Sequence, residues 1–194
     1  MAGRKLAFER EVVLNHAMDL FWEKGYHATG LTELLERMGI KRQSLYNTFG
    51  NKHQLFLEAI AYYGETVVKN LETELLKPGS TVANIEAFFE KIIVNANMLG
   101  CRGCFVLNTL IELAPHDPEV AQEVERLCKQ VEKAFELALR QAIAIGELPH
   151  GFPTKQMSRY LHHIALGLHA RTKGVPEPNE LRETLKIALA VLHP

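Results

Sequence analysis

Residues 31–56, LTELLERMGIKRQSLYNTFGNKHQLF, constrain the fold more than any other part of the chain. Apolar side chains recur at helical spacing before Gly39, and Leu45 and Phe49 continue that spacing after it. Glycine can adopt the positive φ that ends a helix, so the segment predicts two short helices joined by a tight turn. Polar side chains fill the face between the apolar positions: Lys41, Arg42, Gln43, Ser44, Tyr46, Asn47 and Thr48. This pattern is typical of a helix-turn-helix that reads base edges in DNA.

The distribution of charge favours a polyanionic partner for the same segment. The whole chain carries a net charge of -1, but residues 1–53 sum to +2 and residues 54–194 to -3. Residues 37–57 contain no carboxylate and four cations, Arg37, Lys41, Arg42 and Lys52. A phosphate backbone lying there would meet only cations and neutral donors, although a solvated protein surface could have the same composition.

Composition sets the class of protein. A hydrophobic content of 47% over 194 residues is sufficient for a buried core, and no apolar run reaches the roughly 20 residues needed to cross a bilayer. The amino terminus lacks the continuous apolar stretch of a secretory signal, and three cysteines do not suggest a disulfide framework. We expect a cytoplasmic protein without a cofactor. An enzyme is the opposing class, but no serine, cysteine or carboxylate arrangement supplies an acid, base or nucleophile.

Every periodic segment is helical, so the predicted fold is all-α. A three-helix DNA-binding domain at residues 1–53 would precede a larger helical effector-binding and dimerisation domain at residues 54–194. Asn51 and Asp117 are predicted N-caps, with Pro118 in the first turn after Asp117 and Gly146 after that helix. The expected helices outside the motif cover residues 10–24, 52–76, 82–98, 104–113, 118–145, 154–173 and 179–192.

The last two predicted helices are apolar on more than one face. Their apolar residues are Tyr160, Leu161, Ile164, Ala165 and Leu168 in one helix, and Leu181, Leu185, Ile187, Ala188, Val191 and Leu192 in the other. Two such helices from each of two subunits could form a four-helix bundle, or both could lie in the core of their own chain. The DNA-binding motif favours a homodimer, because one recognition helix reads only a few base pairs.

The chain resembles the tetracycline-repressor (TetR) family of bacterial regulators along its whole length. The specific part is FWEKGYHATGLTELLERMGIKRQSLYNTFGNKHQLF, which matches the family's GY-x-x-T entry to helix two, its MGI turn and its SLY-x-x-F recognition helix. Leu35 departs from the pattern, which more often has alanine there. The resemblance implies a dimeric regulator, usually a repressor, that binds a palindromic operator in double-stranded DNA and leaves it when a small-molecule effector binds the larger domain.

The resemblance also implies roles for single residues. Arg42, Gln43, Asn47 and Thr48 would face base edges, with Lys41 on the same surface, while Ser44, Tyr46, Lys52, His53 and Thr29, as the cap of helix two, would hold phosphates. Arginine and the amide side chains can form paired hydrogen bonds with guanine and adenine, whereas a lysine at a helix start suits a phosphate. His53 could equally be a solvated surface residue.

The effector site is predicted less sharply. Candidate cavity residues are Tyr62, Phe88, Asn95, Met98, Phe105, Asn108, Glu112, Phe135 and His162, and any of them could be ordinary core. Cys101 and Cys104 form one CxxC, which could be two structural thiols, a redox pair or half of a metal site with Cys128, His162, His163 or His169. We expect no metal, because no second CxxC is present. The alternative function is a regulator that senses oxidation at Cys101 and Cys104.

Overall fold

The computed structural model describes the backbone of residues 2–98, 102–174 and 177–193, and the side chains of residues 10–95, 102–174 and 177–193. Across these ranges the chain forms nine α-helices and one short 3-10 turn and no β-strand, which confirms the all-α prediction. None of the helices in these ranges is long and apolar enough to cross a bilayer.

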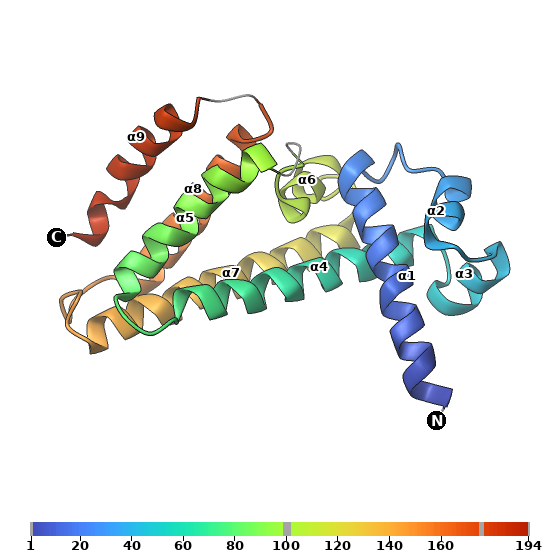
Figure 1. Cartoon of the computed structure of the whole chain (residues 1–194), viewed down its shortest axis with the longest axis horizontal. Helices are drawn as coiled ribbons and strands as arrows, with labels where there is room; N and C mark the ends of the chain where they lie inside the picture. Colours follow the sequence, from blue (N-terminus) through green and yellow to red (C-terminus); the bar gives the residue numbers. More distant parts are fainter. Residues whose placement is uncertain (1, 99–101, 175–176, 194) are drawn as a thin grey trace.

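The amino-terminal helices form a compact unit at one end of an elongated molecule (Figure 1). They are α1 (Ala2–Lys24), α2 (Leu31–Met38) and α3 (Arg42–Phe49). The long helix α4 (Lys52–Leu75) leaves this unit and runs through the rest of the molecule. The helix-turn-helix therefore lies at an end of the molecule, where its outer face is accessible.

The larger part of the chain packs along one side of α4. It consists of α5 (Thr81–Met98), α6 (Phe105–Glu112), α7 (Pro118–Ala144), α8 (Thr154–Arg171) and α9 (Pro178–Leu189), followed by the 3-10 turn η1 (Ala190–Leu192). Helix α7 lies beside α4 along most of its length, and α8 packs on α7 (Figure 1). Helix α9 packs on α5.

Local signals explain where several helices begin and end. The Asn51 side chain accepts a hydrogen bond from the Gln54 N–H at 2.9 Å, and Asp117 accepts from the Glu119 and Val120 N–H groups at 3.1 Å. All three bonds satisfy amides that a helix start leaves unpaired. Gly39 ends α2 with a φ of 66°, in the left-handed region. These predicted caps are confirmed.

Some predicted boundaries are wrong. Helix α1 begins at Ala2 and not near residue 10; apart from Gly3 in its first turn, the segment before Arg10 consists mainly of good helix formers and contains no proline. Helix α8 ends at Arg171, two residues earlier than expected, and the last predicted helix divides into α9 and η1.

Two apolar cores share the helices α4 and α7. One core joins α1, α2, α3 and α6 to the first halves of α4 and α7, and the other joins α5, α8 and α9 to their second halves. The ends of the two shared helices are also linked, because His53 Nε2 lies 2.7 Å from Asp117 Oδ2. The helix-turn-helix is thus packed directly on residues of the larger domain.

Gly64 allows α4 and α7 to approach closely. A Cβ atom at Gly64 would lie 2.2 Å from Cδ2 of Leu127, which is closer than real Cβ contacts come. Only glycine fits without a shift of the Leu127 side chain or of one of the two helices. Any substitution there would alter the packing of the helix that connects the two cores.

Most apolar residues of the last two helices are buried within the chain itself. Leu161, Ala165 and Leu168 in α8 are buried, as are Leu181 and Leu185 in α9. Most of the apolar side chains of these two helices therefore pack in the core of their own chain. Ile187 and Val191 remain exposed, with Ile187 at 78%.

Candidate functional site

Helix α3 presents a polar surface held up by two buried anchors. Leu45 is fully buried and Phe49 is 4% exposed, and both belong to the core that contains α1 and α4. The seven polar residues predicted for DNA contact on and before α3 are all exposed: Lys41, Arg42, Gln43, Ser44, Tyr46, Asn47 and Thr48. The two buried residues lie on the opposite side of α3, so they hold this exposed face outward.

Two pairs of side chains on α3 preorganise its surface. Gln43 Nε2 donates to Asn47 Oδ1 at 2.9 Å, and the Arg42 guanidinium lies 5.8 Å from the centre of the Tyr46 ring. Both pairs are four residues apart, so they lie on the same side of the helix. Each still presents hydrogen-bond donors to solvent, which is what recognition of base edges and phosphates requires.

Thr29 is placed differently from its prediction. Its side chain is 1% exposed, and its hydroxyl donates to the Gly25 carbonyl at 2.6 Å. The N-cap of α2 is Gly30, so the prediction that Thr29 caps this helix is wrong. The hydroxyl proton of Thr29 already has an acceptor inside the protein and is not available to a phosphate. Thr29 instead stabilises the loop that joins α1 to α2.

Lys52 and His53 also have partners within the chain. Lys52 Nζ donates to the Tyr26 carbonyl at 2.7 Å and lies 4.2 Å from the centre of the Tyr26 ring. Burial lowers the pKa of Lys52, and the nearby Glu112 carboxylate partly offsets this. His53 is half-buried against Asp117. Both residues therefore hold α4 against neighbouring segments.

Glu112 lies at the junction between the two domains and not in a cavity. Its carboxylate accepts hydrogen bonds from the backbone N–H of Tyr26 at 3.2 Å and of His27 at 2.9 Å. The preceding Gly25 has a φ of 82°, and a Cβ atom there would lie 2.6 Å from Glu112 Oε2. The loop between α1 and α2 is thus clamped from two sides, by Lys52 and by Glu112.

A cavity of about 240 Å³ lies between α4, α5, α8 and the segment before α6. Trp22 of α1 forms part of its wall, together with Tyr63 on α4 and Phe88 on α5. The lining is mainly apolar, with a few polar groups. Size and lining suit one small organic molecule.

Few of the predicted cavity residues line this space. Phe88 and Asn95 do. Met98 has a side chain outside the described residues. Phe105 and Phe135 are core residues, 2% and 0% exposed, and Tyr62 packs against the core around α1. Asn108 instead bonds the Arg102 carbonyl and Lys173, while His162 lines a different groove beside Cys128.

Sequence patterns missed the residues that connect the cavity to α1. Trp22 Nε1 donates to the Gly103 carbonyl at 3.2 Å, and the Arg102 guanidinium lies 4.8 Å from the centre of the Trp22 indole. Arg102 Nη1 also lies 3.2 Å from Asp19 Oδ1. The lone tryptophan near the end of α1 was the available signal, because a large ring there needs a partner beyond a three-helix module.

Cys104 and Cys128 have surroundings that oppose an easily oxidised thiolate. Burial raises the pKa of the Cys104 thiol, and it raises that of Cys128 to about 11. Arg102, which could have favoured a thiolate, is not among the groups that shift the pKa of Cys104; its guanidinium lies beside Asp19 and over the Trp22 ring. Cys101 lies outside the described residues.

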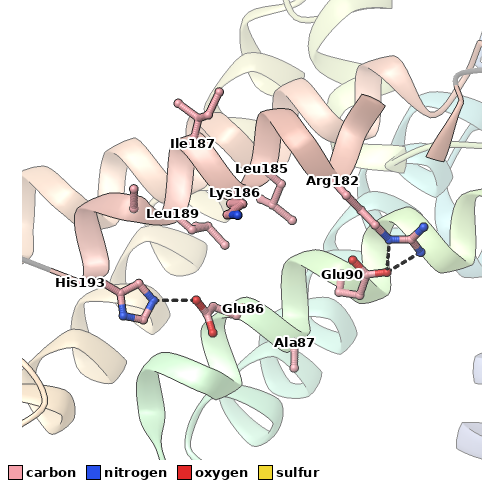
Figure 2. Close-up of a pocket in the computed structure, with 10 residues that line it drawn as sticks. Glu86, Ala87, Glu90, Arg182, Leu185, Lys186, Ile187, Leu189 and His193 are labelled. Carbon is pink, nitrogen blue, oxygen red and sulfur yellow. Dashed lines mark hydrogen bonds and ion pairs between the residues drawn. The ribbon is translucent and has the colours of Figure 1, made fainter. Parts of the chain in front are cut away.

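A larger and more open groove lies between α5 and α9 (Figure 2). An ion pair between Arg182 and Glu90 at 2.6 Å crosses it, as does a side-chain contact between His193 Nε2 and Glu86 Oε1 at 2.8 Å. In Figure 2, Leu185 and Leu189 point toward α5, whereas Ile187 points away from it. The groove is distant from α3, and its residues hold α9 on the outside of the molecule.

Comparisons with known proteins agree with this arrangement. Residues 13–59 match the family described as bacterial regulatory proteins, tetR family, and residues 81–188 match the tetracyclin repressor-like C-terminal domain. The HTH-type transcriptional regulator YezE from Bacillus subtilis (strain 168) is 38% identical over 98% of this chain and 99% of its own length. The HTH-type transcriptional repressor ComR from Escherichia coli (strain K12) is 29% identical over 96% of this chain and 88% of its own.

A solved structure is similar over almost the same span. It is a cysteine mutant of the TetR family transcriptional regulator CifR, complexed with 26 bp of double-strand operator DNA. Its TM-score is 0.79 at 26% identity, covering 93% of this chain and 95% of that one.

Proposed function

The chain belongs to the tetR family of bacterial regulatory proteins, and we propose that it is a dimeric repressor that a small molecule releases from a palindromic operator. The single observation that carries this proposal is the exposed, carboxylate-free surface of α3 above the buried Leu45 and Phe49. Such a surface suits the major groove, where arginine and amide side chains distinguish bases.

Repression is supported by the named relatives. ComR, which is called a repressor, aligns with 96% of this chain. In a repressor, the helix-turn-helix competes with transcription by occupying the operator, and no further activating surface is needed.

The length of DNA that must be read and the exposed surface of the last helices both support a dimer. One recognition helix reads a few base pairs, so two copies on successive major grooves, about 34 Å apart, make a longer site possible. The exposed faces of α8, α9 and η1 offer the contact: Ile187 of α9 and Val191 of η1 are apolar, and Gly167 and Ala170 of α8 are small enough for helices to approach closely. This dimer would use the last two helices.

Effector release is supported by the path from the cavity to α3. Helix α4 begins next to the helix-turn-helix and lines the cavity with Tyr63, Val67 and Asn70. A ligand that fits the cavity better in a conformation with differently spaced α3 helices would shift the population toward that conformation. The ligand weakens operator binding only by this preference.

A mobility-shift assay tests the proposal. Purified protein should retard a fragment from upstream of its own gene at concentrations that leave a scrambled fragment free, and some small molecules should reverse the shift. Arg42→Ala should weaken the shift at least tenfold, whereas Arg140→Ala, which removes an exposed arginine of α7, should leave it unchanged. Equal retardation of both fragments, or equal effects of both variants, would contradict the proposal.

A further inference from the structure

The cavity behind Trp22 has hydrogen-bonding groups of a definite kind. Arg102 and Lys91 are its cations, and Glu74 is the carboxylate in its lining. Glu74 is already paired, with Lys77 at 2.7 Å and with Lys91 at 3.4 Å. Among the described residues of the lining, a ligand that enters this cavity therefore meets no unpaired carboxylate.

The hydrogen-bonding groups of the cavity that remain available to a ligand are mostly donors. One nitrogen of Arg102 contacts Asp19, and a guanidinium has five N–H groups, so most of them can still bind a ligand. The Asn95 amide has no hydrogen-bond partner within the part of the chain that the structure describes. Burial lowers the pKa of His169 to about 4, so this imidazole adds no charge near neutral pH. The polar part of the cavity thus suits an anion better than a cation.

The apolar part suits one aromatic ring. Trp22, Tyr63 and Phe88 provide aromatic surfaces, and Val67 and Ile92 provide aliphatic ones. A cavity of about 150 Å³ can hold benzene, so 240 Å³ accommodates one ring with a short substituent.

We propose that the ligand of this cavity is a monocyclic aromatic carboxylate, with its ring against Trp22 and Tyr63 and its carboxylate on Arg102. This inference rests on the proposed function, in which the same cavity holds the effector. It adds a direct consequence for α1: the ligand carboxylate competes with Asp19 for the guanidinium of Arg102. Binding would then loosen the contact that ties the segment before α6 to α1.

Trp22 makes the proposal measurable, because it is the one tryptophan in the sequence and lies in the cavity wall. The full-length protein is titrated with benzoate and with benzamide, which has the same shape without the charge, at constant ionic strength. Benzoate should change the tryptophan fluorescence saturably and bind at least tenfold more tightly than benzamide. Equal affinities, or no saturable change with benzoate, would overturn the proposal.

Variants assign the preference to one side chain. Arg102→Gln should weaken benzoate binding at least tenfold and leave benzamide binding unchanged. Asp19→Asn removes the competing carboxylate from a half-exposed position and should strengthen benzoate binding severalfold. Arg182→Gln, in the exposed pair with Glu90, is the matched control and should change neither. If Asp19→Asn weakens benzoate binding, the proposed competition is wrong even where Arg102→Gln does not fold.

A second measurement separates this inference from the proposed function. The mobility shift is repeated with benzoate and with other small molecules. Fluorescence binding of benzoate without operator release would retain the ligand class and contradict effector release. Release by another molecule, with no benzoate binding, would retain the proposed function and overturn the ligand class.

Discussion

Gly25 leaves the space that the carboxylate of Glu112 occupies. A Cβ atom at Gly25 would lie 2.6 Å from Glu112 Oε2, and the φ of 82° is one that other residues rarely adopt. The same carboxylate accepts the Tyr26 and His27 N–H groups. One glycine and one glutamate thus fix the loop between α1 and α2 on α6.

Gly25→Ala should lower the free energy of unfolding by about 2–4 kcal/mol, because backbone strain adds to the clash with Glu112. The measurement is urea denaturation. Gly39→Ala is the control: its φ is also positive, but nothing lies within 4 Å of the added methyl group, so it reports strain alone. The clash with Glu112 would be refuted if Gly25→Ala lost no more unfolding free energy than Gly39→Ala. It would also be refuted if adding Glu112→Ala to Gly25→Ala restored none of that loss.

Asn47→Ala should relax base preference at one position of each half-site, at a cost of about 1–3 kcal/mol for the preferred base.

The side chain of Lys41, which is exposed and has no partner in the described ranges, should act on phosphates. Lys41→Ala should therefore weaken binding to all sequences alike and reduce the salt slope by about one. Binding to a set of single-base operator variants at several salt concentrations measures both. A change of base preference in Lys41→Ala would reverse the assignment.

His169 should make the fold less stable at mildly acidic pH. Burial lowers its pKa to about 4 from the ordinary 6.5, so between these values the unfolded chain binds a proton that the folded chain does not. Stability is complete above pH 6.5 and falls as the pH drops through this window. His162, whose pKa burial also lowers, adds to the loss. His169→Gln should reduce the difference in unfolding free energy between pH 7.5 and 5.0.

The control for that experiment is His150→Gln, at an exposed position, which should keep the full pH dependence. An undiminished loss of stability in His169→Gln would show that the imidazole is not the titrating group.

Ile187→Glu should disrupt the proposed dimer, because it places a charge on the exposed apolar face of α9. We expect sedimentation to show the mass falling toward the 21.9 kDa of one chain, with operator affinity falling in parallel. Val12→Glu changes an exposed apolar residue of α1 and should leave the mass unchanged. A stable dimer in Ile187→Glu would move the interface elsewhere.

The helices were predictable where a few adjacent residues decide the outcome. Asp117 with Pro118 begins α7, and Gly39 ends α2, because caps and positive φ are local properties. The exposed face of α3 also follows from spacing alone. The cavity did not follow from sequence, because Trp22 and Arg102 meet through contacts between segments 80 residues apart. Glu112 was misplaced for the same reason: a polar residue among apolar neighbours can serve a backbone loop as readily as a ligand.

Because α4 and α7 belong to both cores, the amino-terminal unit cannot be separated from the rest of the chain without exposing apolar surface. Residues 1–53 contain all the residues of the proposed recognition surface, but the apolar side of that unit is completed by α4, α6 and α7. Cut out alone, the segment would expose the faces that Phe56, Phe105 and Val124 now cover. A chimaera that transplants this operator specificity onto another scaffold must carry those helices along, and heating should melt the intact chain in a single step.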